Sequence, residues 1–520
     1  MKMPNIVPSA SLRRARPGRS WTSLTAPIVI GKDILELLGS SMYIDPMSIY
    51  REYVQNAADA IDDARESALV DEGTVDFAID VAARTVKIRD NGCGLAESDF
   101  LQRLTSFGAS DKRGQQARGF RGIGRLGGIG YCQELIFRSR TKGEQFGNEL
   151  RWDCKELKTL LREDSLGNLG EIVQQAVAHR RLAADDWPEH FFEVELRGIV
   201  RHRNDQLLDP VAIHTYLSQV GPVPFSPEFR YAEQIDASLS PQVKLGNLQI
   251  RISGCPDPVC RPHRNSVVLG SEISDEIKDL QFFTIPAVDG GAAAVGWVLH
   301  HGYTGALPLN TRIRGLRLRV GNIQIGDDRI LEELFLEGRF NSWVVGEIHV
   351  LDKRVVPNGR RDHVEQNVHF HNLLTHILPI ARELSRNCRQ SSIRRNRSRE
   401  FLRCVEAAQQ KLSIVKQGAL SRTEQGRLLR EVHTGIAELE KLAERGLFEQ
   451  AGHLNPRAHI RKLKRDVEKI ERRQNIRSRL SQLPRARRQA YERIFSLIYE
   501  CAQNRTSAKA LVDRIIARLG

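Results

Sequence analysis

The sequence has no long apolar run and few aromatic side chains. Only 6% of its 520 residues are aromatic, and no apolar run approaches the roughly 18–20 residues that a membrane helix needs. Residues 1–23 are basic and rich in Pro and Ser, but they lack the apolar stretch of a secretory signal. The eight cysteines are scattered rather than grouped as a disulfide framework. We therefore expect no membrane association and a reducing, cytoplasmic location.

Charge is unevenly distributed along the chain. Residues 391–520 hold 30 Lys and Arg against 14 Asp and Glu, a net charge of +16, whereas the rest of the chain has a net charge of −2. A basic region of this kind suits nucleic acid or another polyanion. The alternative interpretation is a solvated helical surface with surplus arginine, because aromatic side chains that could stack on bases are sparse there.

The pattern of elements predicts about three domains in an α+β chain. A flexible basic tail is expected at 1–26, and alternating helices and strands around Gly-rich loops at 27–205. Residues 206–385 have a mixed pattern, and residues 386–520 are almost entirely helical. Apolar residues there recur in steps of three and four, a coiled-coil-like seam formed by Ile460, Leu463, Val467 and Ile470.

The first chemical motif lies on a predicted helix at 49–61. Apolar residues at Ile49, Tyr53, Ala57 and Ile61 would form its core stripe. Glu52, Asn56 and Asp59 follow one another at spacings of four and three, which puts them on one face. A carboxylate beside an amide oxygen suits water activation next to a magnesium ion. The alternative is an ordinary amphipathic helix with a solvated polar face.

The second motif follows a predicted strand pair, 75–81 and 85–89. The second strand ends in Asp90, followed by Asn91, Gly92, Cys93 and Gly94. The glycines permit a tight turn that leaves Asp90 free to accept a hydrogen bond from a ligand amine. A plain hairpin turn is the alternative, since Asn-Gly is a common turn signal.

The third motif is a run with six glycines in the twelve residues 119–130. Its backbone N–H groups could cradle phosphates. The run also fits the dinucleotide-binding pattern, but the residues before it, 111–118, are polar and basic instead of forming the strand that this pattern requires. The sequence contains no P-loop Gly-Lys-Ser/Thr, so P-loop and kinase mechanisms lose support.

The three motifs, in this order within about 80 residues, resemble the GHKL ATPase superfamily of gyrase B, heat-shock protein 90, MutL and histidine kinases. The resemblance implies an N-terminal Bergerat α/β sandwich at 27–205, an α/β middle domain at 206–385 and an all-α, coiled-coil-like C-terminal region at 386–520. It implies Glu52 as the general base and Asn56 as the magnesium ligand. Histidine kinases lack a Glu in the place of Glu52, which favours the hydrolase branch.

By the same resemblance, Asp90 accepts a hydrogen bond from the adenine amine. Gly92 and Gly94 would shape the adenine pocket, the third motif would wrap the triphosphate, and residues 105–118 would be the ATP lid. The ATP-binding residues implied are Asn56, Asp59, Asp90, Gly92, Gly94, Gly119, Gly122, Ile123 and Gly124.

Within the superfamily the chain is most similar to heat-shock protein 90. Its helix reads Glu-x-x-x-Asn-x-x-Asp-Ala-x-Asp from Glu52, as in those chaperones. Residues 355–362 also resemble the chaperones' middle-domain loop, whose Arg reaches the γ-phosphate. Register puts Arg361 in that position, with Arg360 as the alternate; an exposed loop with paired arginines is the other interpretation. An Arg from a second domain can stabilise charge as the phosphate transfers.

Two departures bear on function. The family's late-strand Thr is not found in residues 192–196, and the basic C-terminal region does not resemble the chaperone dimerisation domain. The expected protein is a magnesium-dependent ATPase that couples hydrolysis to lid closure and a dimerisation cycle for chaperone-like remodelling. The alternatives are a DNA-associated ATPase, in repair, chromosome handling or phage defence, and a slowly hydrolysing ATP-gated clamp. A homodimer, and a nucleic acid or protein client bound by the C-terminal helices, are the expected partners.

Overall fold

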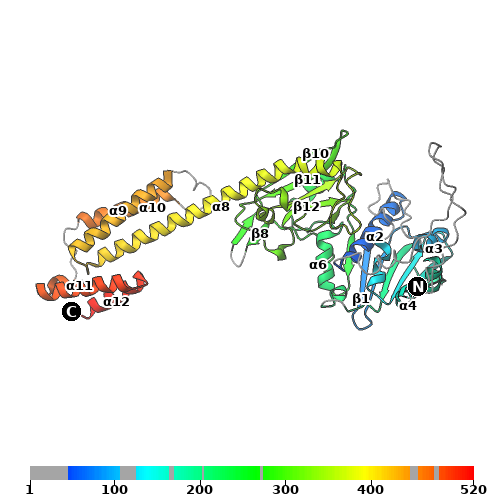
Figure 1. Cartoon of the computed structure of the whole chain (residues 1–520), viewed down its shortest axis with the longest axis horizontal. Coiled ribbons are helices and arrows are strands. Elements are labelled where there is room, and N and C mark those ends of the chain that lie inside the picture. Colours follow the sequence, from blue (N-terminus) through cyan, green and yellow to red (C-terminus); the bar gives the residue numbers. More distant parts are fainter. Residues whose placement is uncertain are drawn as a thin grey trace, which may run out of the picture. The chain divides into compact units, whose positions relative to one another are not determined.

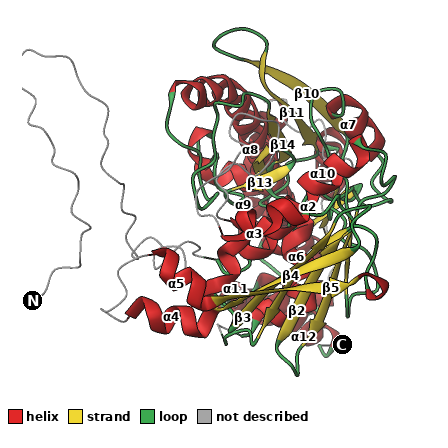
Figure 2. Ribbon diagram, turned by 90° about the vertical axis from the view of Figure 1, so that its right-hand side faces the viewer, coloured by secondary structure: helices red, strands yellow, loops and turns green. Residues whose placement is uncertain are grey.

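A computed structural model describes residues 45–105, 124–162, 169–201, 204–269, 273–444, 455–472 and 479–519. The chain divides into two compact units, Met1–Ser385 and Arg386–Gly520. Figure 1 shows the elements in chain order and Figure 2 shows them by type. The α+β class predicted from the sequence is confirmed, with a mixed sheet and helices first, a second sheet next and helices last. No helix in the described ranges is long and apolar enough to cross a bilayer.

The first sheet has seven strands in the order β5-β4-β3-β6-β2-β1-β7. All its pairs are antiparallel except β1 with β7. The strand pair expected at 75–81 and 85–89 corresponds to β1 and β2. The strands are β1 Thr74–Asp80, β2 Thr85–Asp90, β3 Glu134–Arg140, β4 Phe146–Asp153, β5 Val177–Ala183, β6 Phe191–Arg197 and β7 Gln249–Ile252.

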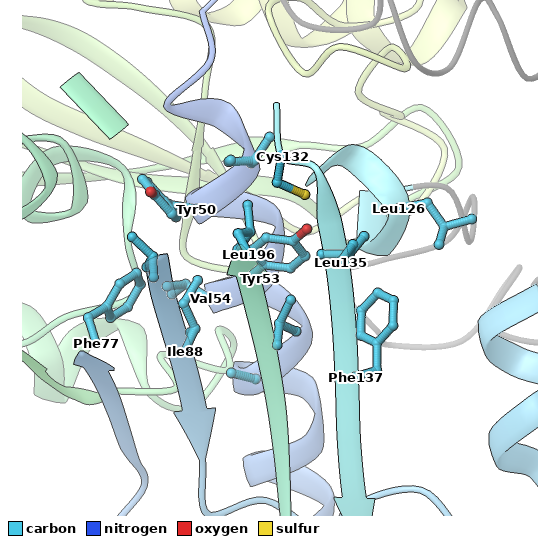
Figure 3. Close-up of a cluster of buried hydrophobic side chains, with 14 of the residues drawn as sticks. Tyr50, Tyr53, Val54, Phe77, Ile88, Leu126, Cys132, Leu135, Phe137 and Leu196 are labelled. Carbon is cyan, nitrogen blue, oxygen red and sulfur yellow. The ribbon is translucent and has the colours of Figure 1, made fainter. Parts of the chain in front are cut away.

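Helices share a hydrophobic core with this sheet. The core includes residues of α6 and β7, which follow the predicted domain boundary at residue 205. The helices are α2 Ser48–Glu66, α3 Glu97–Thr105, α4 Cys154–Arg162, α5 Leu169–Ala176 and α6 Pro210–Val220, with short 3-10 turns η1 Gly124–Gly130, η2 Ala184–Asp186 and η3 Gln206–Leu208. Figure 3 shows Tyr50, Tyr53 and Val54 of α2 packed against Phe77, Ile88, Leu135, Phe137 and Leu196 of four strands.

Away from this core, charged residues of alternating sign are paired across all seven strands. Each pairs by register with the next, so every carboxylate has a guanidinium on both sides. Such cross-strand pairs specify register, because a slip of one residue would bring apolar residues into their places. From β5 to β7 this charge ladder is Arg180, Glu149, Arg138, Glu193, Arg89, Asp76 and Arg251.

Arg138 is the centre of the charge ladder and is only 5% exposed. It bonds Glu149 and Glu193 at 2.6 Å each and Glu195 at 2.5 Å. Burial alone would raise the pKa of Glu149, but hydrogen bonds from Arg180 and Arg138 hold that pKa below its ordinary value.

Replacing Arg138 with methionine is therefore expected to lower the free energy of unfolding by about 3–5 kcal/mol, because three buried carboxylates lose their shared partner. Chemical denaturation at pH 7 measures this loss. It should shrink as the pH falls below about 4, where the carboxylates take up protons. The control is Arg151→Met, which breaks an exposed ion pair with Glu134 and should cost less than about 1 kcal/mol. Equal losses in the two variants would contradict the role given to Arg138.

The second sheet has five strands in the order β10-β11-β14-β12-β13, with β12 parallel to β14. Its hydrophobic core includes Trp297, Leu299 and Val345. The elements of this part are α7 Ala232–Leu239, β8 Ser266–Leu269, β9 Ile273–Glu276, β10 Asp279–Pro286, β11 Ala292–His300, η4 Leu309–Thr311, β12 Gly315–Val320, β13 Ile323–Ile325, η5 Glu332–Leu334, η6 Gly338–Trp343 and β14 Val345–Val350.

A buried ion cluster ties this second sheet to the end of α6. Glu347 of β14 accepts hydrogen bonds from Arg261 and Arg319, at 2.7 Å each. Arg319 also donates to the carbonyl oxygen of Gln219 at 2.7 Å, and Arg261 donates to that of Val223 at 3.0 Å. A guanidinium suits the unsatisfied carbonyls at a helix C-terminus. The strand that leads to the loop at 355–362 is thereby fixed to the helix that packs on α2.

In the described residues of the C-terminal unit, all the regular elements are helices. Its core contains the predicted seam, since Ile460, Leu463, Val467 and Ile470 are all buried. The helices are α8 Val368–Gln417, which begins in the first unit, α9 Arg422–Glu444, α10 Pro456–Arg472, α11 Arg485–Cys501 and α12 Arg505–Ala517, with η7 Arg479–Gln482.

Candidate functional site

Helix α2 carries the first predicted motif. Its apolar stripe faces the sheet, and the opposite side of each turn presents the polar residues. Glu52 and Asp59 are buried, at 7% and 5% exposure, whereas Asn56 is half-buried. The polar face is therefore covered by other parts of the chain, and it is not the solvated face of an ordinary amphipathic helix.

The carboxylate of Glu52 lies between two arginines. Its Oε1 is 3.2 Å from Nε of Arg361 and 3.5 Å from Nη2 of Arg51. Arg51 also donates to the carbonyl oxygen of Arg360 at 3.0 Å. Arg361 is 6% exposed and Arg360 is exposed, so the geometry brings the Arg361 side chain to Glu52.

The backbone of Arg361 has a φ of +55°, which is uncommon outside glycine. The amide of Gly326 donates to the Arg361 carbonyl at 2.9 Å and helps to hold this conformation. Backbone strain of this kind persists only where surrounding contacts maintain it, and it concentrates at functional sites. The second sheet therefore holds Arg361 in a defined position against α2.

Asp90, at the end of β2, is buried. Its Oδ1 accepts a hydrogen bond from the amide of Gly92 at 2.9 Å. Burial raises the pKa of Asp90 to about 7, against the opposing effect of that hydrogen bond. Gly94 has a φ of +73°, and a Cβ there would lie 2.2 Å from the carbonyl oxygen of Arg140. Only glycine fits this turn, which holds Asp90 at the strand end.

The second and third motifs, which contain the glycines, both contact α2. The amide of Cys93 donates to the carbonyl of Ala60 at 3.2 Å, which ties the Asp90 turn to the helix. A Cβ on Gly124 would lie 2.3 Å from Oε2 of Glu52, so the third motif packs directly on the carboxylate. Outside the described residues lie Gly119, Gly122 and Ile123, together with 106–118 of the expected lid and the expected tail at 1–26.

Residues 47–167 match the family model described as histidine kinase-, DNA gyrase B- and HSP90-like ATPase. They form a GHKL-type ATPase domain. The match covers α2, the Asp90 turn and η1, and it confirms the superfamily resemblance predicted from the three motifs.

Curated proteins with low sequence identity to this chain support the same assignment. The chain is similar to the chaperone protein HtpG of Alkalilimnicola ehrlichii, 25% identical over 203 residues, which are 35% of this chain and 30% of that protein. HtpG of Shewanella frigidimarina is 27% identical over 201 residues, 35% of this chain and 31% of that protein. The matching stretch thus spans only about a third of the relatives' length.

Asn56 of the GHKL domain is a suitable ligand for magnesium. Its side chain makes no hydrogen bond within the described part of the chain, and it lies one turn after Glu52. Magnesium prefers oxygen ligands and usually keeps several waters, taking few ligands from the protein. No cluster of three or more His, Cys, Asp or Glu that could hold a metal occurs within the described ranges. An amide oxygen beside a bound triphosphate fits this pattern.

Two neighbours of the site were not predicted from the sequence. Arg51 precedes Glu52 directly, and its position in the chain was a signal that could have been used. His190 donates a hydrogen bond from Nδ1 to the carbonyl oxygen of Gly92 at 2.9 Å. No local pattern connects it to a residue 98 positions away. Strand β6 pairs Phe192 with Asp90 and contains no Thr, so the family's late-strand motif is absent from that strand.

Proposed function

We propose that this protein binds ATP in its GHKL domain and hydrolyses it with the help of magnesium. The observation that carries the proposal is the convergence of Glu52, Gly124 and Arg361, three residues from separate parts of the chain, at one buried point. Such a convergence suits a γ-phosphate, which needs a base for water, a wrapping loop and a cation.

Nucleotide recognition is assigned to the two glycine motifs. Oδ2 of Asp90 accepts a hydrogen bond from the adenine amine, while Oδ1 stays with the Gly92 amide. Gly92 and Gly94 have no side chain, so the backbone itself forms the wall of the adenine pocket there. The third motif encloses the triphosphate with Gly119, Gly122, Ile123 and Gly124. Asp59, one turn after Asn56 on α2, supports the same pocket.

Hydrolysis is assigned to Glu52 and Arg361. Glu52 orients the attacking water and takes its proton. Asn56 would hold magnesium, which neutralises charge on the phosphates. Arg361 leaves Glu52 for the γ-phosphate when ATP binds, and its positive charge stabilises the charge that develops during transfer. Since Arg361 lies in the loop that follows β14 of the second sheet, hydrolysis depends on how this loop packs against α2.

The output of this cycle is a conformational change. By its resemblance to heat-shock protein 90, the lid closes over ATP and the GHKL domains of a homodimer meet, which supports chaperone-like remodelling of proteins. A second output is favoured by the net charge of +16 in residues 391–520, which suits a DNA-associated ATPase. All eight cysteines are free thiols, which agrees with a cytoplasmic location.

Arg361→Ala and Arg360→Ala form a matched pair that tests the proposal. We expect Arg361→Ala to lower kcat for ATP hydrolysis by about 10²-fold or more, because a cation is lost from the transition state. Arg360→Ala should stay within a few fold of the wild type, since its side chain is exposed and only its backbone contacts Arg51. Phosphate release measures kcat, and calorimetry with ATP should show binding retained in both variants. Equal kcat values in the two variants would refute the assignment, and no hydrolysis by the wild type would favour an ATP-gated clamp.

A further inference from the structure

The solvent face of α10 carries a regular stripe of basic side chains. Arg457, Arg461, Arg465 and Lys469 repeat every four residues, which places them on one face with steps of about 6 Å along the axis. All four are exposed. The buried seam of the same helix faces the opposite way, into the core of the C-terminal unit.

These four charges, here called the α10 stripe, lack acidic partners. No Asp or Glu in the described ranges lies within ion-pair distance of any of them. Charged residues on the flanks of α10, by contrast, do form ion pairs. Lys464 pairs with Glu440 at 2.6 Å, and Asp466 pairs with Lys416 at 3.3 Å. These ion pairs between α10 and its neighbours therefore lie on the flanks of the helix, and Glu468 pairs within the helix with Arg472 at 4.0 Å, so the outer face keeps a net positive charge.

The residue composition of this face argues against several classes of binding partner. Apart from Ala458, the residues around the stripe are charged, whereas protein interfaces depend on aromatic and apolar anchors. A helix that lies on a membrane inserts its apolar face, but the apolar face of α10 is buried within the unit. Single-stranded nucleic acid is bound through stacking on aromatic rings, and α10 has none.

We propose that the α10 stripe binds the phosphate backbone of double-stranded DNA without reading its sequence. From Arg457 to Lys469 the stripe extends about 18 Å, and each DNA strand offers a phosphate about every 3.4 Å along the duplex axis. All four side chains can therefore contact phosphates of one duplex. Duplex RNA is recognised in part through its 2′-hydroxyls, and the face of α10 carries no hydroxyl or amide side chain.

This inference deepens the DNA-associated form of the proposed function and names the surface responsible. Binding to the stripe needs no nucleotide, so it can be measured in the absence of ATP. Failure of DNA binding would leave the hydrolysis proposal standing, and failure of hydrolysis would leave the stripe proposal standing.

The test is fluorescence anisotropy of the full-length protein with a labelled 30-base-pair duplex of arbitrary sequence. The stripe variant combines Arg457→Gln, Arg461→Gln, Arg465→Gln and Lys469→Gln. We expect its Kd at 50 mM salt to be at least about tenfold weaker, and the slope of log K against log salt to be shallower by about 3–4, since each phosphate contact contributes about 0.9.

A matched control removes four positive charges from the first unit. Its members are exposed basic residues without ion pairs in the described structure, namely Lys155→Gln, Arg201→Gln, Lys278→Gln and Lys353→Gln. This variant should bind the duplex within about twofold of the wild type. If both variants lose affinity equally, net charge alone explains binding and the stripe proposal is overturned.

A charge-retaining variant separates binding from folding. Arg457→Lys, Arg461→Lys and Arg465→Lys together should preserve the Kd within a few fold, because phosphate accepts either cation as a point charge. Far-UV circular dichroism and the Tm check that the Gln variant remains folded. An unchanged salt slope in a folded Gln variant would overturn the proposal, as would tighter binding of the wild type to duplex RNA, heparin or phosphatidylserine vesicles than to DNA.

Discussion

Replacing Glu52 by glutamine is expected to reduce ATP hydrolysis by about 10²–10⁴-fold while ATP still binds, because the amide cannot accept a proton from water. In the wild type, Nε of Arg361 lies 3.2 Å from Oε1 of Glu52. The glutamine keeps an Oε1 atom that can accept a hydrogen bond from this group. The loss therefore reports on the proton acceptor and leaves the arginine close to its position. Phosphate release measures hydrolysis, and calorimetry measures ATP binding.

Glu52→Ala is expected to lower the thermal stability of the protein as well as its rate of hydrolysis. It removes the carboxylate between Arg51 and Arg361, two side chains that are 5% and 6% exposed. The two buried guanidiniums would then lose the carboxylate that lies between them, so we expect Glu52→Ala to lower the Tm as well as the rate. Glu66→Ala is the matched control, since Glu66 ends the same helix, is exposed and pairs with Lys244 at the surface. Hydrolysis at the wild-type rate by Glu52→Gln would rule out Glu52 as the base.

The helix that carries Glu52 could be predicted because its evidence is local. Ile49, Tyr53, Ala57 and Ile61 recur at helical spacing, and all four are at most 3% exposed. The same periodicity put Glu52 on the opposite face, but it did not reveal that this face is covered. The covering residues are Gly124, 72 positions later in the sequence, and Arg361, 309 positions later, and no helical period extends that far.

The loop at 355–362 shows how a motif can leave an ambiguity that three-dimensional structure addresses. In the sequence, the register of the motif favours Arg361 and leaves the adjacent Arg360 as the alternate. The positive φ of Arg361 brings its side chain to Glu52, while the carbonyl of Arg360 accepts a hydrogen bond from Arg51. Backbone conformations of this kind depend on the surrounding sheet and have no signature in an Arg-Arg pair.

The charge ladder of the first sheet was not predicted, for a topological reason. Strand β6 lies between β2 and β3, so Glu193 meets Arg138, 55 residues earlier, and Arg89, 104 residues earlier. Alternating polar and apolar residues identify each strand separately. They do not specify which strands become neighbours, and the ladder exists only once that order is known.

Asp90 provides the second test with a large expected effect. Asp90→Asn should weaken ATP binding by about 10–100-fold, the cost of leaving a buried polar group unpaired. The amide of Gly92 donates to Oδ1 at 2.9 Å, and an asparagine would keep its oxygen there. Its NH₂ group would then face the adenine amine, donor against donor. Calorimetry with ATP measures the loss.

The same substitution should stabilise the free protein, with a distinct pH dependence. Because the pKa of Asp90 is about 7 in the folded protein and about 3.9 when unfolded, the folded state holds an extra proton between these values. The contribution of Asp90 to the stability of the wild type therefore falls as the pH rises from about 4 to about 7, and it stays reduced by on the order of 4 kcal/mol above that range. Asp90→Asn removes this penalty, so its Tm advantage should be small near pH 4 and greatest at pH 8.

Asp80→Asn is the control for both effects. Asp80 ends the neighbouring strand β1, is exposed, and likewise accepts a backbone hydrogen bond, from Ala83 at 2.8 Å. Its substitution should change neither ATP affinity nor the pH dependence of the Tm. A carboxylate kept in the core at a cost in stability is a group retained for binding, since selection for stability alone would favour the amide. Equal melting profiles for wild type and Asp90→Asn would contradict that conclusion, and unchanged ATP affinity would contradict the assigned contact with adenine.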